Sequence, residues 1–156
     1  MTRSRTAQGR LLTAGCGTAL LVLSFVPLWA TYRVPGLGLF PPETVHRNAW
    51  AAYGLGIQVA LMLAVAAMLL AAAGAARRGV PAVRDGRASF ATSVAALAAL
   101  VAEAVSGPEG SSDPSGYGIS RGVLLFLGLG LACGMTYGGY VTMRGTRPER
   151  SIDGGE

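Results

Sequence analysis

Hydrophobic residues are concentrated in four long blocks of the chain, which are separated by polar stretches and by segments rich in glycine and proline. A helix needs about 20 apolar residues to cross a bilayer core about 30 Å thick, and the blocks are close to this length or longer. They lack the alternating pattern of barrel strands, and backbone groups in hydrocarbon must be hydrogen-bonded internally, so helices are expected. The pattern predicts an all-α membrane protein with four transmembrane helices at residues 11–32, 49–76, 88–105 and 122–143.

The arginines that flank these blocks predict the orientation of the chain. All 13 basic side chains are Arg, and all but three lie before the first block, between the second and third, or after the fourth. The three on the other side are Arg33, Arg47 and Arg121. Because cytoplasmic flanks carry the excess of basic residues, both termini are predicted to be cytoplasmic. Residues 1–10 and a disordered tail at 145–156 would then enclose a four-helix membrane domain at 11–144.

The third block is the shortest, and an alternative without it has to be considered. It is rich in alanine, whose transfer to lipid gains little, and it carries Glu103. Without this span the chain would cross the membrane three times, and its Arg-rich tail would lie outside. Four spans are favoured because they keep the tail in the cytoplasm.

Aromatic residues mark the predicted outer ends of the first two spans. Trp29 and Tyr32 close the first, and Trp50 and Tyr53 open the second, as expected for rings at a membrane interface. Pro27 should kink the first helix or end its regular hydrogen bonding.

The two outer connections are predicted to be loops. Residues 33–48 contain several prolines and glycines, and residues 106–121 are rich in Gly, Ser and Pro, so the second loop should be mobile. Asn48 suits the N-cap of the second helix.

Small residues predict where the helices pack. Helices in lipid gain little from hydrophobicity alone, so close approach through glycine and alanine is the main packing signal. The fourth span carries a stripe of glycines at four-residue spacing: Gly130, Gly134 and Gly138. We expect a tight helix contact along it.

Two polar residues within the spans are candidates for function. Glu103 is the one acidic residue inside a span, and it continues a small-residue face of the third helix, so it should point toward the bundle. It could form an interfacial ion pair with Arg121, Arg33 or Arg47, or bind a proton or cation. Gln58 lies nearer the middle of the membrane, where it could hydrogen-bond a neighbouring helix or a partner.

The signatures of common enzymes are missing from the sequence. With no Lys there is neither a Walker lysine nor a Schiff base. His46, the one histidine, lies near Glu43 and Thr44 in a predicted loop, and no cysteine and histidine cluster suits a metal. The formal charge of +5 comes from arginines beside apolar blocks, which favours anionic lipid at the cytoplasmic face over nucleic acid. We therefore expect neither cofactor nor metal.

Two short motifs carry a resemblance to a known family. The motifs are Phe25-Val26-Pro27-Leu28-Trp29 and Asn48-Ala49-Trp50-Ala51-Ala52-Tyr53. They resemble the Phe-Leu-Pro-Trp-Tyr and Ser-Ala-Trp-Gln-Ala-Phe pair of small actinobacterial four-span membrane proteins, a largely uncharacterised family. An extra Leu28 precedes Trp29, and Ala51 replaces the Gln. The resemblance covers the first two spans and implies a multi-pass protein of a bacterial plasma membrane, with no implied activity.

Three functions fit these observations. The first is a non-enzymatic subunit or scaffold that packs through its helices, either with further copies of itself or with another membrane protein. The second is a small channel or carrier with Glu103 and Gln58 in a polar path. The third is a small membrane enzyme, for which His46 and Glu43 are the loop candidates.

Overall fold

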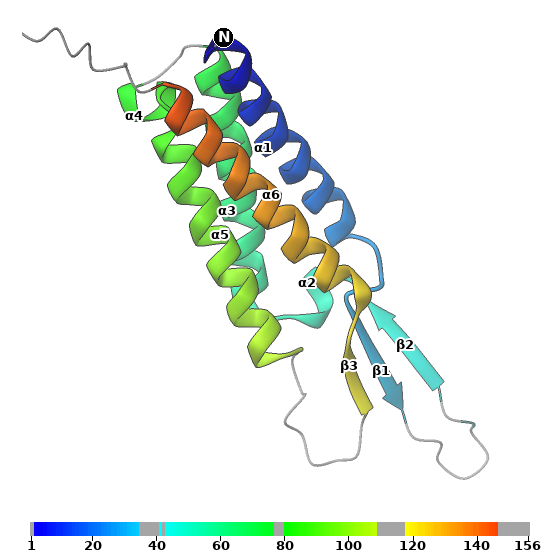
Figure 1. The fold of residues 1–156 in the computed structure, drawn as a ribbon. Coiled ribbons are helices and arrows are strands. Elements are labelled where there is room, and N and C mark those ends of the chain that lie inside the picture. Colours follow the sequence, from blue (N-terminus) through cyan, green and yellow to red (C-terminus); the bar gives the residue numbers. More distant parts are fainter. Residues whose placement is uncertain (1, 35–40, 42, 77–79, 109–117, 147–156) are drawn as a thin grey trace, which may run out of the picture.

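The computed structural model describes residues 2–34, 41, 43–76, 80–108 and 118–146. Four long helices run side by side as a bundle, and a small sheet extends from one end of it (Figure 1). The long helices are α1 (Thr2–Ser24), α3 (Leu55–Ala75), α5 (Arg87–Ser106) and α6 (Val123–Gly145). Each packs against two neighbours, α1 on α3 and α6, and α5 on the same pair. Two short helices, α2 (Ala49–Ala52) and α4 (Pro81–Arg84), complete the helical part.

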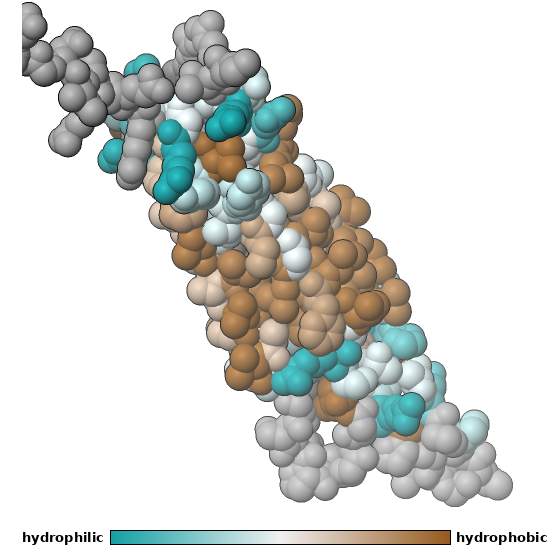
Figure 2. All heavy atoms as spheres, in the orientation of Figure 1, coloured by the Kyte–Doolittle hydropathy of each residue, from teal (hydrophilic) through white to brown (hydrophobic). Residues whose placement is uncertain are grey.

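Three of these helices are long and apolar enough to cross a membrane: α3, α5 and α6, among the described residues. The third predicted block, which was the shortest, is helical from Arg87 to Ser106. Figure 2 shows an apolar band around the visible face of the bundle, with hydrophilic residues gathered at both ends. This distribution is that of a membrane protein. We call the end with the strands the sheet end and the opposite end, where α1 begins and α6 finishes, the arginine end.

The predicted end of the first helix was wrong. The helix ends at Ser24 and not at residue 32, and the chain turns before Pro27. Proline has no backbone N–H to continue the helical ladder. From Ala30 the chain is a strand, so Trp29 and Tyr32 do not lie on a helix.

The second predicted span is interrupted near its start. Asn48 caps α2 as predicted, because its side chain accepts a hydrogen bond from the Ala51 N–H at 2.9 Å. The helix then stops at Tyr53, which is extended, and α3 begins at Leu55.

The outer connections contain strands where loops were predicted. Strands β1 (Ala30–Val34), β2 (Glu43–Arg47) and β3 (Gly118–Arg121) form an antiparallel sheet in the order β2-β1-β3. Tyr32 pairs with Val45 on one side and with Ile119 on the other. The sheet therefore joins the segment after the first helix to the segment before the last. The rest of the two predicted loops and the predicted disordered tail lie largely outside the described residues.

Candidate functional site at the sheet end

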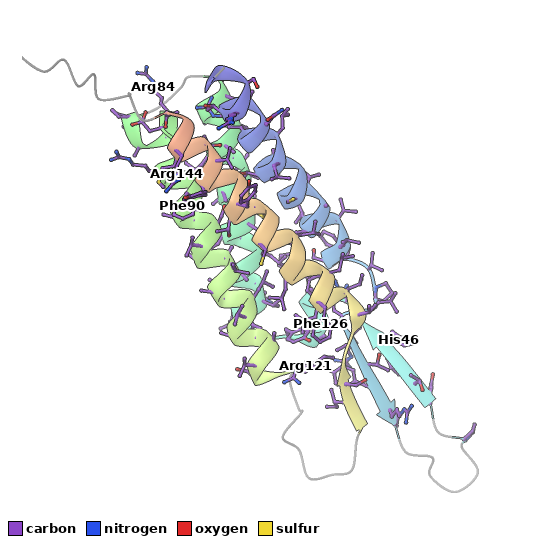
Figure 3. The ribbon with its side chains drawn as sticks, in the orientation of Figure 1. His46, Arg84, Phe90, Arg121, Phe126 and Arg144 are labelled. Atoms are coloured by element: carbon purple, nitrogen blue, oxygen red, sulfur yellow. The ribbon has the colours of Figure 1, made fainter. Side chains whose placement is uncertain are left out.

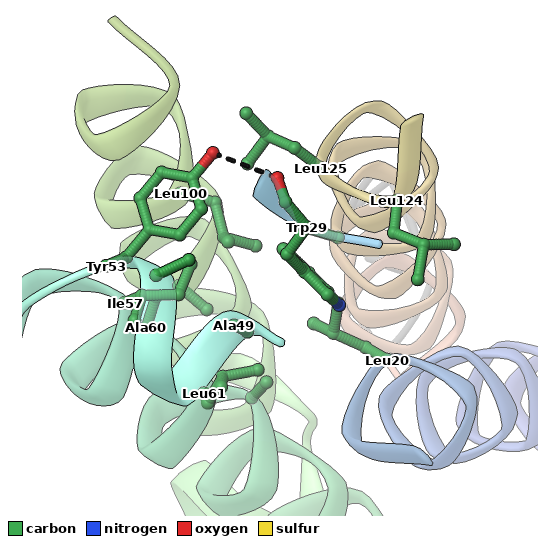
Figure 4. Packing of buried hydrophobic residues seen from close by; sticks show 14 of the residues in the cluster. Leu20, Trp29, Ala49, Tyr53, Ile57, Ala60, Leu61, Leu100, Leu124 and Leu125 are labelled. Atoms are coloured by element: carbon green, nitrogen blue, oxygen red, sulfur yellow. Dashed lines mark hydrogen bonds between the residues drawn. The ribbon is translucent and has the colours of Figure 1, made fainter. Parts of the chain in front are cut away.

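Trp29 joins the sheet to the bundle. Its side chain is fully buried, and its indole Nε1–H donates to the Leu23 carbonyl oxygen at 2.7 Å. Its backbone N–H donates to the Arg47 carbonyl at 3.0 Å, and its own carbonyl accepts from the Gly122 N–H at 2.7 Å. Figure 4 shows the ring among apolar side chains of several helices. The polar group of Trp29 is therefore satisfied inside the protein, and its position at the membrane interface stays a prediction.

Gly122 is a residue that the sequence did not single out. A methyl group at this position would collide with the Leu28 carbonyl, so only glycine lets the start of α6 approach Trp29 this closely. The one sequence signal is its position directly before an apolar run, which is too common to be informative alone.

Tyr32 and Trp50, two further aromatic residues of this end, contact nearby groups of the protein. The Tyr32 hydroxyl donates to the Ala52 carbonyl at 3.2 Å, and the Arg47 guanidinium lies 4.9 Å above the Tyr32 ring. Trp50 stacks on Phe25 at 5.9 Å between ring centroids. Its Nε1–H donates to Ser24 Oγ at 3.0 Å. These contacts fix α2 and the strands to the end of α1.

Tyr53 and Glu103 form the polar part of this end. The Tyr53 side chain is buried, and its hydroxyl donates to the Trp29 carbonyl at 3.4 Å (Figure 4). Burial raises the pKa of Tyr53 to about 12, and Tyr32 and Glu103 add to this rise while the Arg121 cation opposes it. Glu103 of α5 and Arg121 of β3 thus both act on the Tyr53 hydroxyl, which lies just before α3 in the chain.

Glu103 lies against α3, on the small-residue face of its own helix. A methyl group on Gly56 would collide with the Glu103 carboxylate, so this glycine makes room for it. Glu103 as a whole is half-buried. Gln58, two positions after Gly56, points to nearly the opposite side of α3. The two polar residues therefore do not share a helix face, which removes support for a path lined by both.

Arg121 is held by a backbone carbonyl of α5. Its Nη2 donates to the Val105 carbonyl oxygen at 2.9 Å, near the end of α5 (Figure 3). That bond satisfies a carbonyl in the last turn of the helix. A direct Glu103–Arg121 ion pair stays a prediction.

The predicted glycine stripe of α6 meets α1 over part of its length. A methyl group on Gly138 would lie 2.6 Å from the Gly9 carbonyl oxygen, and one on Gly134 would lie 2.8 Å from Cys16 Sγ. Gly130 has no atom of the described residues within 4 Å of such a group. The Thr13 hydroxyl adds a hydrogen bond across the same contact, to the Met135 carbonyl at 3.2 Å.

His46 and Glu43 do not form a catalytic pair. Both lie on β2, three residues apart, so their side chains project to opposite faces of the sheet. His46 Nδ1 lies 3.2 Å from Thr31 Oγ1 on the neighbouring strand, and its side chain is exposed.

Comparison with known proteins adds no relative: no family model and no curated protein matches the chain. The resemblance to the actinobacterial four-span family stays a prediction.

Proposed function

We propose that the chain is a non-enzymatic scaffold or subunit of a bacterial plasma membrane, with four spans and both termini in the cytoplasm. The observation that carries this proposal is the attachment of the sheet to the bundle through Trp29, which is fully buried where α1, α3, α6 and two strands meet. Such an attachment holds a small platform at a fixed position on the membrane surface.

The proposed fourth span is α1. It has 23 residues, which at about 1.5 Å per residue gives about 34 Å. It packs on α3 and α6, and its outward side chains Leu11 and Val22 are exposed and apolar. Arg5 and Arg10 lie in its first turns, at the same end as Arg84 and Arg144, which is the arrangement expected of cytoplasmic flanks.

The sheet supplies the proposed contact surface. Strands β2 and β3 are both edge strands, each with one row of backbone groups unpaired within the described sheet. Edge strands bind partners through main-chain hydrogen bonds. The partner would be a further copy of the chain or another membrane protein.

Cysteine labelling tests the spans. In a Cys16→Ala/Cys133→Ala background, single cysteines replace Gln8, Thr44 or Thr146. A membrane-impermeant maleimide added to intact cells should label the Thr44 position, and should label the other two only after permeabilisation. Labelling of the Thr146 position from outside would overturn the proposed topology, and continued protection of the Gln8 position in the same experiment would indicate three spans.

Photocrosslinking tests the contact surface. A photoreactive residue at Thr44, on the exposed edge strand β2, should give discrete protein adducts in cells. The matched control is Val101, which is exposed on α5 and expected to face lipid. If the Thr44 probe captures no protein beyond what the Val101 probe captures, the scaffold function by way of β2 is wrong.

A further inference from the structure

A groove lies between α1 and α6 at the arginine end, away from the sheet. Its volume is about 750 Å³. The side chains that line it include Arg5, Gln8 and Leu12 of α1 and Tyr137, Val141 and Arg144 of α6.

The two walls of the groove follow the same pattern. On α1, residues 5, 8 and 12 are spaced as one helix face, and on α6 residues 137, 141 and 144 are spaced likewise. Each wall has its arginine at the end of the bundle and an apolar or aromatic residue seven positions inward, which is about 10 Å deeper. The groove is therefore cationic at its mouth and apolar below.

The cations at the mouth are positioned for an anion. The Arg144 guanidinium is held 4.9 Å above the Tyr140 ring, which in turn lies 6.1 Å from Phe90 of α5 (Figure 3). Stacking on a ring leaves the guanidinium edge able to donate to a phosphate. Among the residues that the structure describes, neither Arg5 nor Arg144 forms an ion pair with an acidic side chain, and no acidic residue lines the groove.

The neighbouring groove at the same end shows the contrast. It has a similar volume, about 780 Å³, but Asp85 lies in its wall. The Arg10 guanidinium there already donates to the Arg84 carbonyl at 2.6 Å. Asp85 partly offsets the positive charge of this second groove, so the groove suits an anion less well.

We propose that the α1–α6 groove binds one anionic phospholipid, with the headgroup phosphate between Arg5 and Arg144 and an acyl chain against Leu12, Tyr137 and Val141. A free phosphate would fill the mouth and leave the apolar floor exposed to water, so a lipid fits the whole groove. This inference rests on the proposed membrane location and adds a specific ligand to it.

Native mass spectrometry of the full-length protein in neutral detergent tests the proposal. Titration should show one site per protein that phosphatidylglycerol fills at a lower lipid concentration than phosphatidylcholine does. Arg5→Gln/Arg144→Gln should weaken phosphatidylglycerol binding about tenfold or more. The matched control, Arg84→Gln/Arg87→Gln, removes the same charge from the same end and should change binding less than about twofold.

A second variant separates the site from general charge effects. Val141→Phe keeps both arginines but narrows the apolar floor, so it should also weaken binding of the lipid. Inorganic phosphate at millimolar concentration should not displace phosphatidylglycerol. The lipid site would be overturned if both double arginine variants lost the same amount of phosphatidylglycerol binding, or if the protein bound the two lipids with equal affinity. In either case, a protein that still required detergent would leave the membrane location intact. A protein that stays dissolved without detergent would instead overturn the membrane location itself.

Discussion

The two ends of the bundle are built in different ways. At the sheet end, the polar groups of Trp29, Trp50 and Tyr53 each find a partner within the protein, and the rings pack against apolar side chains. At the arginine end, the helices meet through glycine and threonine, and two grooves of about 750 and 780 Å³ lie between them. The first arrangement fixes a surface in place, whereas the second leaves space that a ligand can occupy.

The two ends should therefore differ in how strongly their contacts contribute to stability. Burial of large side chains with satisfied polar groups should make the sheet end sensitive to substitution. Arg5, Arg144 and Tyr137 of the α1–α6 groove should contribute little to folding, because their side chains stay exposed in the folded protein.

Trp29→Ala should destabilise the protein most. Removal of a fully buried indole should lower the free energy of unfolding by about 3–5 kcal/mol. Tyr137→Ala, at the arginine end, removes a ring that is 62% exposed and should change it by less than about 0.5 kcal/mol. Denaturation in mixed micelles, followed by circular dichroism, measures both. Similar losses in the two variants would contradict the comparison.

The next effect concerns the contact of α1 with α6. Gly138→Val should lower stability by about 1–3 kcal/mol, because the new side chain meets the Gly9 carbonyl and the Thr13 backbone. Gly130→Val is the matched control on the same helix, with open space around it, and should be nearly neutral. The same denaturation experiment compares them. If Gly130→Val lowered stability and Gly138→Val did not, α6 would pack through a different face from the one described.

A pH-dependent effect should be confined to the sheet end. The folded protein holds the Tyr53 proton up to about pH 12, while the unfolded chain releases it near the ordinary tyrosine pKa of about 10. The contribution of Tyr53 to the free energy of unfolding is therefore complete below pH 10. It is then lost as the pH rises from about 10 to 12. Tyr53→Phe should remove this part of the alkaline loss. Melting temperatures of the two proteins across that range provide the measurement, and parallel curves would show that Tyr53 titrates normally.

The helices could be predicted from the sequence because hydrocarbon imposes one strong condition, a run of about 20 apolar residues, on each span. Residues 88–105 and 122–143 satisfy it and are helical within a few residues of the predicted limits. The position of Glu103 toward the bundle followed from helical spacing for the same reason. Periodicity within one helix needs no knowledge of its neighbours.

The sheet could not be predicted in this way. Its strands have four or five residues, and Glu43–Arg47 shows no regular alternation of apolar and polar positions. The pairing of Tyr32 with Ile119 joins segments far apart in the chain, which no local pattern encodes. The sequence placed Trp29 on the first helix, but that helix ends at Ser24, and the Leu23 carbonyl satisfies the Trp29 Nε1–H inside the protein, a contact that no local pattern encodes.

The coupling between Glu103 and Arg121 should contribute least to stability. Both act on Tyr53, yet Arg121 is exposed and donates to the Val105 carbonyl, so a direct pair with the half-buried Glu103 should contribute only about 0.2–1 kcal/mol. A double-mutant cycle with Glu103→Gln and Arg121→Gln measures the coupling, and added salt should reduce it. A coupling above this range would make the pair a main support of the sheet end. Zero coupling would mean that Glu103 is held by its fit against Gly56 alone, and then Gly56→Ala should be as costly in the Glu103→Gln background as in the native chain.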